Sequence, residues 1–187
     1  MIPKDILNLV YLCRHYGLNE VADYWEGVVR INEYQKNRFV LNILRAMFNT
    51  LAGKRICLFG FAFKANTGDT RETPALSIAR KLMEENAELV ISDPQALENA
   101  KKDLRDSKGE ITYIEDPYKA VSQCHAIAIL TEWDLYRNID YEKVFSKMKK
   151  PAFVFDGRNI LNHKKLFDMG FNVYSVGRPP LTHFRVD

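Results

Sequence analysis

Short apolar runs alternate with helical segments after residue 53, and this alternation constrains the fold more than any other feature. Strands are predicted at residues 55–59, 88–91, 111–114, 125–130, 152–155 and 172–176. Helices are predicted at residues 74–86, 117–122, 141–148 and 163–169. Strands separated by helices are typical of right-handed crossovers, so we expect an α/β fold with a Rossmann-like, doubly wound parallel sheet. The charged residues 101–110 have no clear period and predict a surface loop or a variable helix.

The first fifty residues instead repeat apolar positions every three to four residues, which predicts helices. One helix is expected at residues 4–16 and a second from residue 19 to about 49. About thirty residues at ~1.5 Å each make a rod about 45 Å long, which favours a spacer, a dimerisation surface or both. Asn32 and Gln35 near its middle suit a polar contact in a symmetric dimer, or they face water. We therefore divide the chain into a helical linker or dimerisation region, 1-50, and an α/β domain, 51-187.

Composition excludes several functional classes. The 187 residues carry 27 Lys and Arg against 24 Asp and Glu, a surplus too small to indicate nucleic acid or an anionic membrane as a partner. Cys13, Cys57 and Cys124 lack C-x-x-C spacing, so they predict reduced thiols and no zinc site. No apolar run approaches ~18 residues and no signal peptide opens the sequence. We therefore expect a cytoplasmic protein with no metal site.

Ligands of a doubly wound sheet bind beyond the carboxyl ends of its strands, where residues 60–72 are unusual. This segment, G-F-A-F-K-A-N-T-G-D-T-R-E, is about twice the usual 2–6 residues and lacks the G-x-G-x-x-G spacing of a dinucleotide site. The T-P pair after it fits an N-cap and a first helical residue, so a helix N-terminus points into the same crevice. Lys64 and Arg71 either bind phosphate there or pair with Asp69 and Glu72 in a solvated loop.

Two other strand ends carry candidate ligand-binding side chains. Trp133, in T-E-W-D, either caps the core or stacks on a base or sugar, and burial in the core is the favoured interpretation. Arg158, in F-D-G-R-N, has the form of an anion or sugar clamp, and a structural Asp156–Arg158 pair is the alternative. The four histidines share no ligand spacing, and a core role is expected for His125.

These three loops and the front helix resemble the UDP-glucose/GDP-mannose dehydrogenase family, and within it the C-terminal part of the UDP-glucose 6-dehydrogenases. The similarity runs from about Lys4 to the last strand. In that family a long helix joins an N-terminal NAD-binding domain to a C-terminal UDP-binding domain and forms the dimer interface. The resemblance therefore implies UDP-glucose and UDP-glucuronate as ligands, NAD as cofactor and a homodimer. Residues 46–54 match a loop that relatives use to assemble hexamers.

The resemblance also assigns roles to single residues. Phe63 and Lys64 match the pair that contacts the UDP-sugar, and Arg158 matches the arginine that holds the substrate. Arg71 matches the residue that reaches across the interdomain cleft to the NAD diphosphate.

The family reaction is a four-electron oxidation of an alcohol to a carboxylate with two NAD⁺, and it requires a cysteine that captures the aldehyde. Lys4 and Asp5 match the end of the active-site motif G-G-x-C-F-x-K-D, whose aspartate assists deprotonation and hydrolysis, but Met1 stands at the cysteine position. We therefore expect a fragment or truncated gene product that binds the UDP-sugar without turnover. The alternatives are a free-standing nucleotide-sugar-binding module, or part of a dehydrogenase acting on GDP-mannose or UDP-N-acetylmannosamine.

Overall fold

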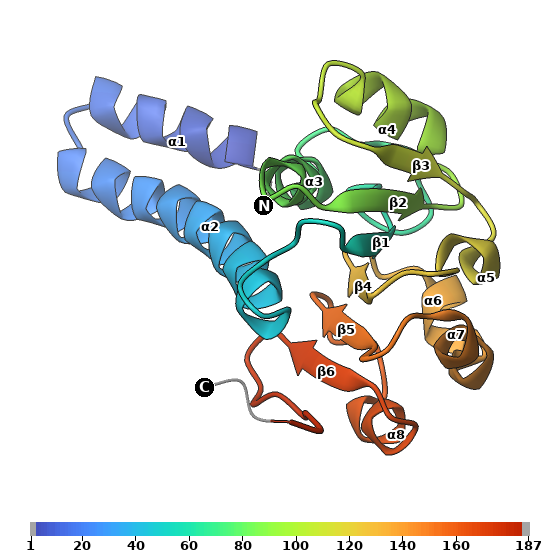
Figure 1. Ribbon diagram of the computed structural model, residues 1–187. Coiled ribbons are helices and arrows are strands. Elements are labelled where there is room, and N and C mark those ends of the chain that lie inside the picture. Colours follow the sequence, from blue (N-terminus) through green and yellow to red (C-terminus); the bar gives the residue numbers. More distant parts are fainter. Residues whose placement is uncertain (1–2, 185–187) are drawn as a thin grey trace.

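The protein is described by a computed structural model that covers residues 3–184, and its centre is a six-stranded sheet (Figure 1). The strands are β1 (Arg55–Phe59), β2 (Glu88–Ser92), β3 (Ile111–Tyr113), β4 (Ala126–Ile129), β5 (Phe153–Asp156) and β6 (Asn172–Ser175). They pair in the order β3-β2-β1-β4-β5-β6, and every pair is parallel. The chain winds outward from β1 in one direction and from β4 in the other, so the predicted doubly wound fold is confirmed.

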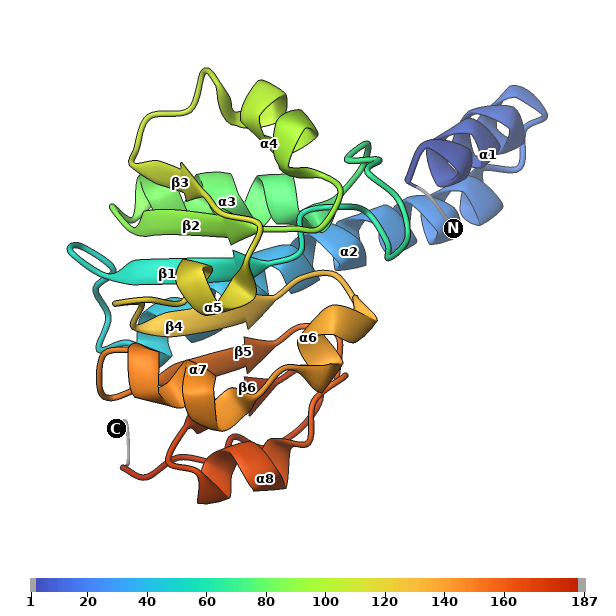
Figure 2. The same cartoon turned by 90° about the vertical axis from the view of Figure 1, so that its right-hand side faces the viewer.

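Helices cover both faces of this sheet. They are α1 (Pro3–His15), α2 (Asn19–Ala46), α3 (Pro74–Glu84), α4 (Leu97–Leu104), α5 (Pro117–Ala120), α6 (Asp134–Asn138), α7 (Tyr141–Lys147) and α8 (His163–Asp168). α2 and α3 lie on one face, and α5 and α7 lie on the other (Figures 1 and 2). No helix described in residues 3–184 has both the length and the apolar character needed to cross a bilayer.

The structure decides between the two interpretations of the charged segment, in favour of a helix for its first residues, and adds one helix that was not predicted. The charged segment at residues 101–110 begins inside α4, a helix that buries Ala100 and Leu104 against the sheet and exposes its charges. The five-residue helix α6 was not predicted, because so short a segment shows no apolar period.

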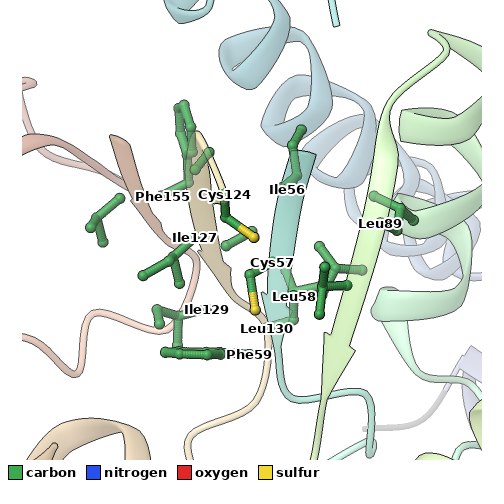
Figure 3. Packing of buried hydrophobic residues seen from close by; sticks show 14 of the residues in the cluster. Ile56, Cys57, Leu58, Phe59, Leu89, Cys124, Ile127, Ile129, Leu130 and Phe155 are labelled. Atoms are coloured by element: carbon green, nitrogen blue, oxygen red, sulfur yellow. The ribbon is translucent and has the colours of Figure 1, made fainter. Parts of the chain in front are cut away.

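Strands β1 and β4 form the centre of the main core, since all their residues except Arg55 are fully buried. Figure 3 shows their apolar side chains packed together, with the sulfur atoms of Cys57 and Cys124 among them. The three cysteines are buried free thiols, in keeping with the reduced state predicted from their spacing. Burial raises the pKa of the Cys57 thiol well above its ordinary value.

The long helix α2 contributes to two separate cores. Its first half packs against α1 in a small cluster whose buried members are Ile6, Val10, Cys13 and Ala22. Its last two turns enter the main core through Val40, Ile43 and Ala46. Between these ends Asn32 and Gln35 are exposed to solvent. The helix therefore links a small helical hairpin to the α/β domain through a stretch that neither core covers.

Candidate functional site

The loop from Gly60 to Thr73 crosses the carboxyl edge of the sheet between β1 and α3. Gly60 begins it with a φ of +94°, and a Cβ atom there would lie 2.4 Å from the Cβ of Thr131. The Thr131 hydroxyl donates a hydrogen bond to the Ala62 carbonyl over 2.6 Å. The loop therefore leaves the strand in a direction that only glycine permits, and the segment after β4 fixes it there.

Asp93, directly after β2, holds the start of this loop in place. Its carboxylate is fully buried. One oxygen accepts hydrogen bonds from the backbone N–H groups of Phe61 (2.7 Å) and Ala62 (3.0 Å) and from Nε1 of Trp133 (3.2 Å). The other oxygen accepts from the N–H groups of Gln95 and Ala96. A single carboxylate thus joins three loops at the sheet edge.

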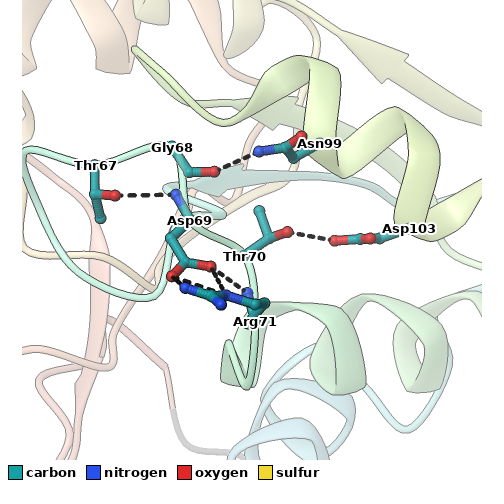
Figure 4. A network of polar contacts seen from close by, with 7 residues as sticks. All are labelled: Thr67, Gly68, Asp69, Thr70, Arg71, Asn99 and Asp103. Carbon is teal, nitrogen blue, oxygen red and sulfur yellow. Dashed lines mark hydrogen bonds and ion pairs between the residues drawn. The ribbon is translucent and has the colours of Figure 1, made fainter.

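Helix α4 holds the outer part of the same loop (Figure 4). Asn99 donates from Nδ2 to the Gly68 carbonyl over 2.7 Å, and the Thr70 hydroxyl donates to Asp103 over 2.6 Å. Gly68 approaches the segment just before α4 so closely that a Cβ atom would lie 2.8 Å from the Gln95 carbonyl oxygen. Side chains from neighbouring segments therefore hold this long loop at both of its ends.

Arg71 lies at the exposed end of this loop. Its side chain is 88% exposed, and its guanidinium donates to both carboxylate oxygens of Asp69, over 2.9 and 2.7 Å. The hydrogen bonds from Arg71 lower the pKa of Asp69 to about 2. The expected alternative of an internal ion pair is thus present for Arg71, while the guanidinium stays open to a ligand outside the loop.

Arg158 meets the loop from the opposite side. Its Nε donates to the Leu130 carbonyl over 2.7 Å and lies 3.2 Å from an oxygen of Glu132. Its Nη2 donates to the carbonyl of Phe63 over 3.4 Å. The side chain remains 31% exposed. The structure therefore brings Arg158 and Phe63, 95 residues apart in sequence, to one place at the carboxyl edge of the sheet.

The Asp156–Arg158 side-chain pair considered from the sequence is not the arrangement found. The buried Asp156 carboxylate instead accepts from the backbone N–H groups of Arg158 (3.0 Å) and Leu161 (3.0 Å). Nε2 of His163 lies 2.9 Å from the same carboxylate. Asp156 thus shapes the loop and leaves the Arg158 guanidinium to point toward Phe63.

The remaining candidate residues lie in different settings. Lys64 follows Phe63, and its exposed side chain has no hydrogen-bond or ion-pair partner within residues 3–184. Lys4 and Asp5 are exposed in the first turn of α1, and no polar contact joins them to the loop within that same part of the chain. Met1, which stands at the position of the family's cysteine, lies outside the described residues.

Trp133 and His125 make hydrogen bonds within the protein and have structural roles. Trp133 is only 6% exposed and donates to Asp93, so the interpretation that it caps the core is confirmed. Nδ1 of His125 accepts a hydrogen bond from the backbone N–H of Arg55, which satisfies it at the start of β4. Burial lowers the pKa of His125.

The arrangement suits an anionic ligand. Lys64 and Arg158 place two cations beside the loop. Thr73 caps α3, whose positive dipole end faces the same edge, and accepts from the N–H of Ala75 over 3.2 Å. Residues 3–184 contain no cluster of three or more His, Cys, Asp or Glu side chains placed to bind a metal ion.

The hydrogen bonds by which Asp93 and Asp156 hold the loops of the site were not predicted from the sequence. Asp93 directly follows β2 and Asp156 ends β5, so both lie at the carboxyl edge of the sheet. This position in the sequence is the signal that could have identified them. Most of their partners are backbone N–H groups, which every residue type except proline supplies, so the sequence gives no sign of these bonds.

Comparison with known protein families gives one matching model, the UDP-binding domain of the UDP-glucose/GDP-mannose dehydrogenase family. It matches residues 57–163, more than half of the chain. This range contains the loop, Asp93 and Arg158.

Similar proteins include UDP-glucose 6-dehydrogenase 2 of Arabidopsis thaliana, 48% identical, and UDP-glucose 6-dehydrogenase 4 of rice (Oryza sativa subsp. japonica), 47% identical. Each alignment covers 94% of this chain and 40% of the relative, so the chain spans about two-fifths of their length. Among solved structures, a UDP-glucose dehydrogenase from the archaeon Pyrobaculum islandicum aligns with a TM-score of 0.73 and 32% identity, covering 92% of this chain and 36% of that one.

Proposed function

Because the chain belongs to the UDP-glucose/GDP-mannose dehydrogenase family, we propose that it is the UDP-binding part of a UDP-glucose 6-dehydrogenase, which oxidises UDP-glucose to UDP-glucuronate. The observation that carries the proposal is the meeting of Arg158 with the carbonyl of Phe63 at the carboxyl edge of the sheet. This edge is where open α/β sheets bind their ligands.

In this proposal Phe63, Lys64 and Arg158 bind the UDP-sugar. The two cations bond to the diphosphate, and each charge-assisted bond is worth about 1.5–3 kcal/mol. Arg158 is prepared for this task, because Asp156 and the carbonyls of Leu130 and Phe63 fix its backbone, its Nε and its Nη2, and its Nη1 has no partner within residues 3–184. Lys64 adds a mobile point charge on a flexible stem.

Arg71 is the residue that we assign to the NAD diphosphate. Its exposed guanidinium fits that group, because its ion pair with Asp69 can be exchanged for a phosphate without disturbing a buried contact. NAD⁺, when bound, accepts the hydride. Lys4 and Asp5 at the start of α1 are assigned to the active-site motif, with Asp5 assisting deprotonation and hydrolysis.

The two-part organisation, residues 1-50 and 51-187, also belongs to this proposal. We assign α2 to a homodimer interface, because Tyr24, Ile31 and Tyr34 are large apolar side chains that this helix exposes to solvent. A cytoplasmic location is also part of this proposal.

Titration calorimetry of the 187-residue chain with UDP tests the assignment. We expect binding in the parent chain and a loss of affinity of about 10–100-fold in Lys64→Ala and in Arg158→Ala. Arg71→Ala is the matched control, since it removes the same charge from the same loop, and its affinity for UDP should stay within about twofold. Absence of UDP binding in the parent chain, or equal losses in all three variants, would contradict the proposed site.

A further inference from the structure

A second candidate site lies on the face of the sheet covered by α2. A groove of about 1050 Å³ runs between the C-terminal half of α2 and the segment that follows β6. Figure 1 shows this end of α2 next to β6. The groove is as large as pockets that hold small-molecule ligands, and none of the residues assigned to UDP or NAD lines it.

All charged residues that line the groove are positively charged. Arg38 and Arg45 line one wall and Arg178 lines the other, while no carboxylate is among the lining residues. Within the described part of the chain, none of these three side chains forms an ion pair or hydrogen bond, although six of the other arginine side chains do.

The two arginines of α2 lie on the same side of the helix. Arg38 and Arg45 are seven residues apart, so they lie on the same side of α2, about 10.5 Å apart along its axis. Asn42 lines the groove between them and supplies amide donors. The floor is aromatic, because Phe155 and Tyr174 stack there with ring centroids 5.2 Å apart.

We propose that this groove is a second anion-binding site, which takes the diphosphate group of a small ligand between Arg38, Arg45 and Arg178. A guanidinium group can donate two parallel hydrogen bonds to the oxygens of one phosphate. No carboxylate lines the groove to compete with a phosphate for these arginines. The aromatic floor suits a ligand with a flat ring attached to the diphosphate. The site does not depend on the proposed function, because it shares no residue with the loop at Lys64.

Calorimetry with inorganic pyrophosphate tests the proposal. The titration uses the Lys64→Ala/Arg158→Ala double variant as its background, which removes the two cations assigned to UDP. We expect binding there, and about tenfold or greater weakening when Arg38→Ala or Arg45→Ala is added. Both arginines are exposed and make no polar contact within residues 3–184, so alanine should leave the fold intact.

Arg30→Ala is the matched control, because Arg30 is an exposed arginine of the same helix outside the groove. Its affinity for pyrophosphate should be unchanged. In ¹⁵N spectra the probe should shift the amide signals of Gly177 and Arg178. A parallel titration with ADP separates two sources of the ligand: tighter binding than pyrophosphate indicates a nucleotide, and equal binding indicates the diphosphate alone.

Three results would overturn the proposal. The first is no pyrophosphate binding in the double-variant background, and the second is unchanged affinity after Arg38→Ala and Arg45→Ala. The third is an equal loss in Arg30→Ala, which would show attraction to the general charge of the helix.

Discussion

Replacing Asp93 by alanine should be among the most destabilising single changes in this protein. The fully buried carboxylate accepts five hydrogen bonds, from four backbone N–H groups and the indole of Trp133. Each buried donor left without a partner costs about 1–3 kcal/mol, so five dry donors would cost about 5–15 kcal/mol. Water entering the space left by the carboxylate satisfies part of them. We therefore expect a loss of about 4 kcal/mol in the free energy of unfolding, at the upper end for one substitution.

The assay is urea unfolding at pH 7, followed by tryptophan fluorescence and circular dichroism, with Asp116→Ala as the control. Asp116 caps α5 and accepts from the N–H of Tyr118 over 2.8 Å, so its loss should cost about 1 kcal/mol. Asp93→Asn should fall between the two, because the amide keeps one acceptor oxygen and turns the other into a donor. If Asp93→Ala cost no more than Asp116→Ala, the assignment of Asp93 as the organiser of the loop would be wrong.

Three further predictions concern the same framework. Gly60→Ala should cost about 3 kcal/mol in urea unfolding, because its Cβ would overlap Thr131, whereas Gly177→Ala, whose Cβ meets no atom within 4 Å, should cost about 1 kcal/mol; equal costs would contradict this. Carboxyl NMR should give Asp69 a pKa of about 2, so that its pairing with Arg71 is complete above its ordinary value of 3.8 and is lost as the pH falls through 2; Arg71→Ala should restore the ordinary value, and no change would refute the pairing. All three cysteines are buried, so a thiol reagent at pH 8 should label them only as fast as the protein unfolds, and rapid labelling of any one would show that it is accessible in the folded state.

The sheet and the long helix were predictable because each carries a strong period. β4 is apolar on both faces, and α2 repeats apolar positions over 28 residues, so tertiary contacts only reinforce what the local pattern indicates. α6 has five residues and no such pattern. A helix near α4 was one of two alternatives, because exposed charges mask the period of the buried Ala100 and Leu104, which lie four residues apart on one face.

The site was predictable in its parts and not in its connections. The length of the loop at residues 60–72 and the position of Arg158 after a buried strand were visible in the sequence. The bonds that join them were not, because Arg158 donates to the carbonyl oxygens of Leu130 and Phe63, and any residue type supplies a carbonyl. The same reason hid Asp93, whose partners are mainly backbone groups.

The attachment of α2 to two cores has a mechanical consequence. A continuous helix of 28 residues is about 42 Å long and resists bending, because bending would break its internal hydrogen bonds. The hairpin with α1 therefore cannot swing freely, and any tilt of it must turn the whole rod about its base near Ile43 and Ala46. Arg45 lines the groove at that base, so the tilt of the hairpin and the width of the groove change together.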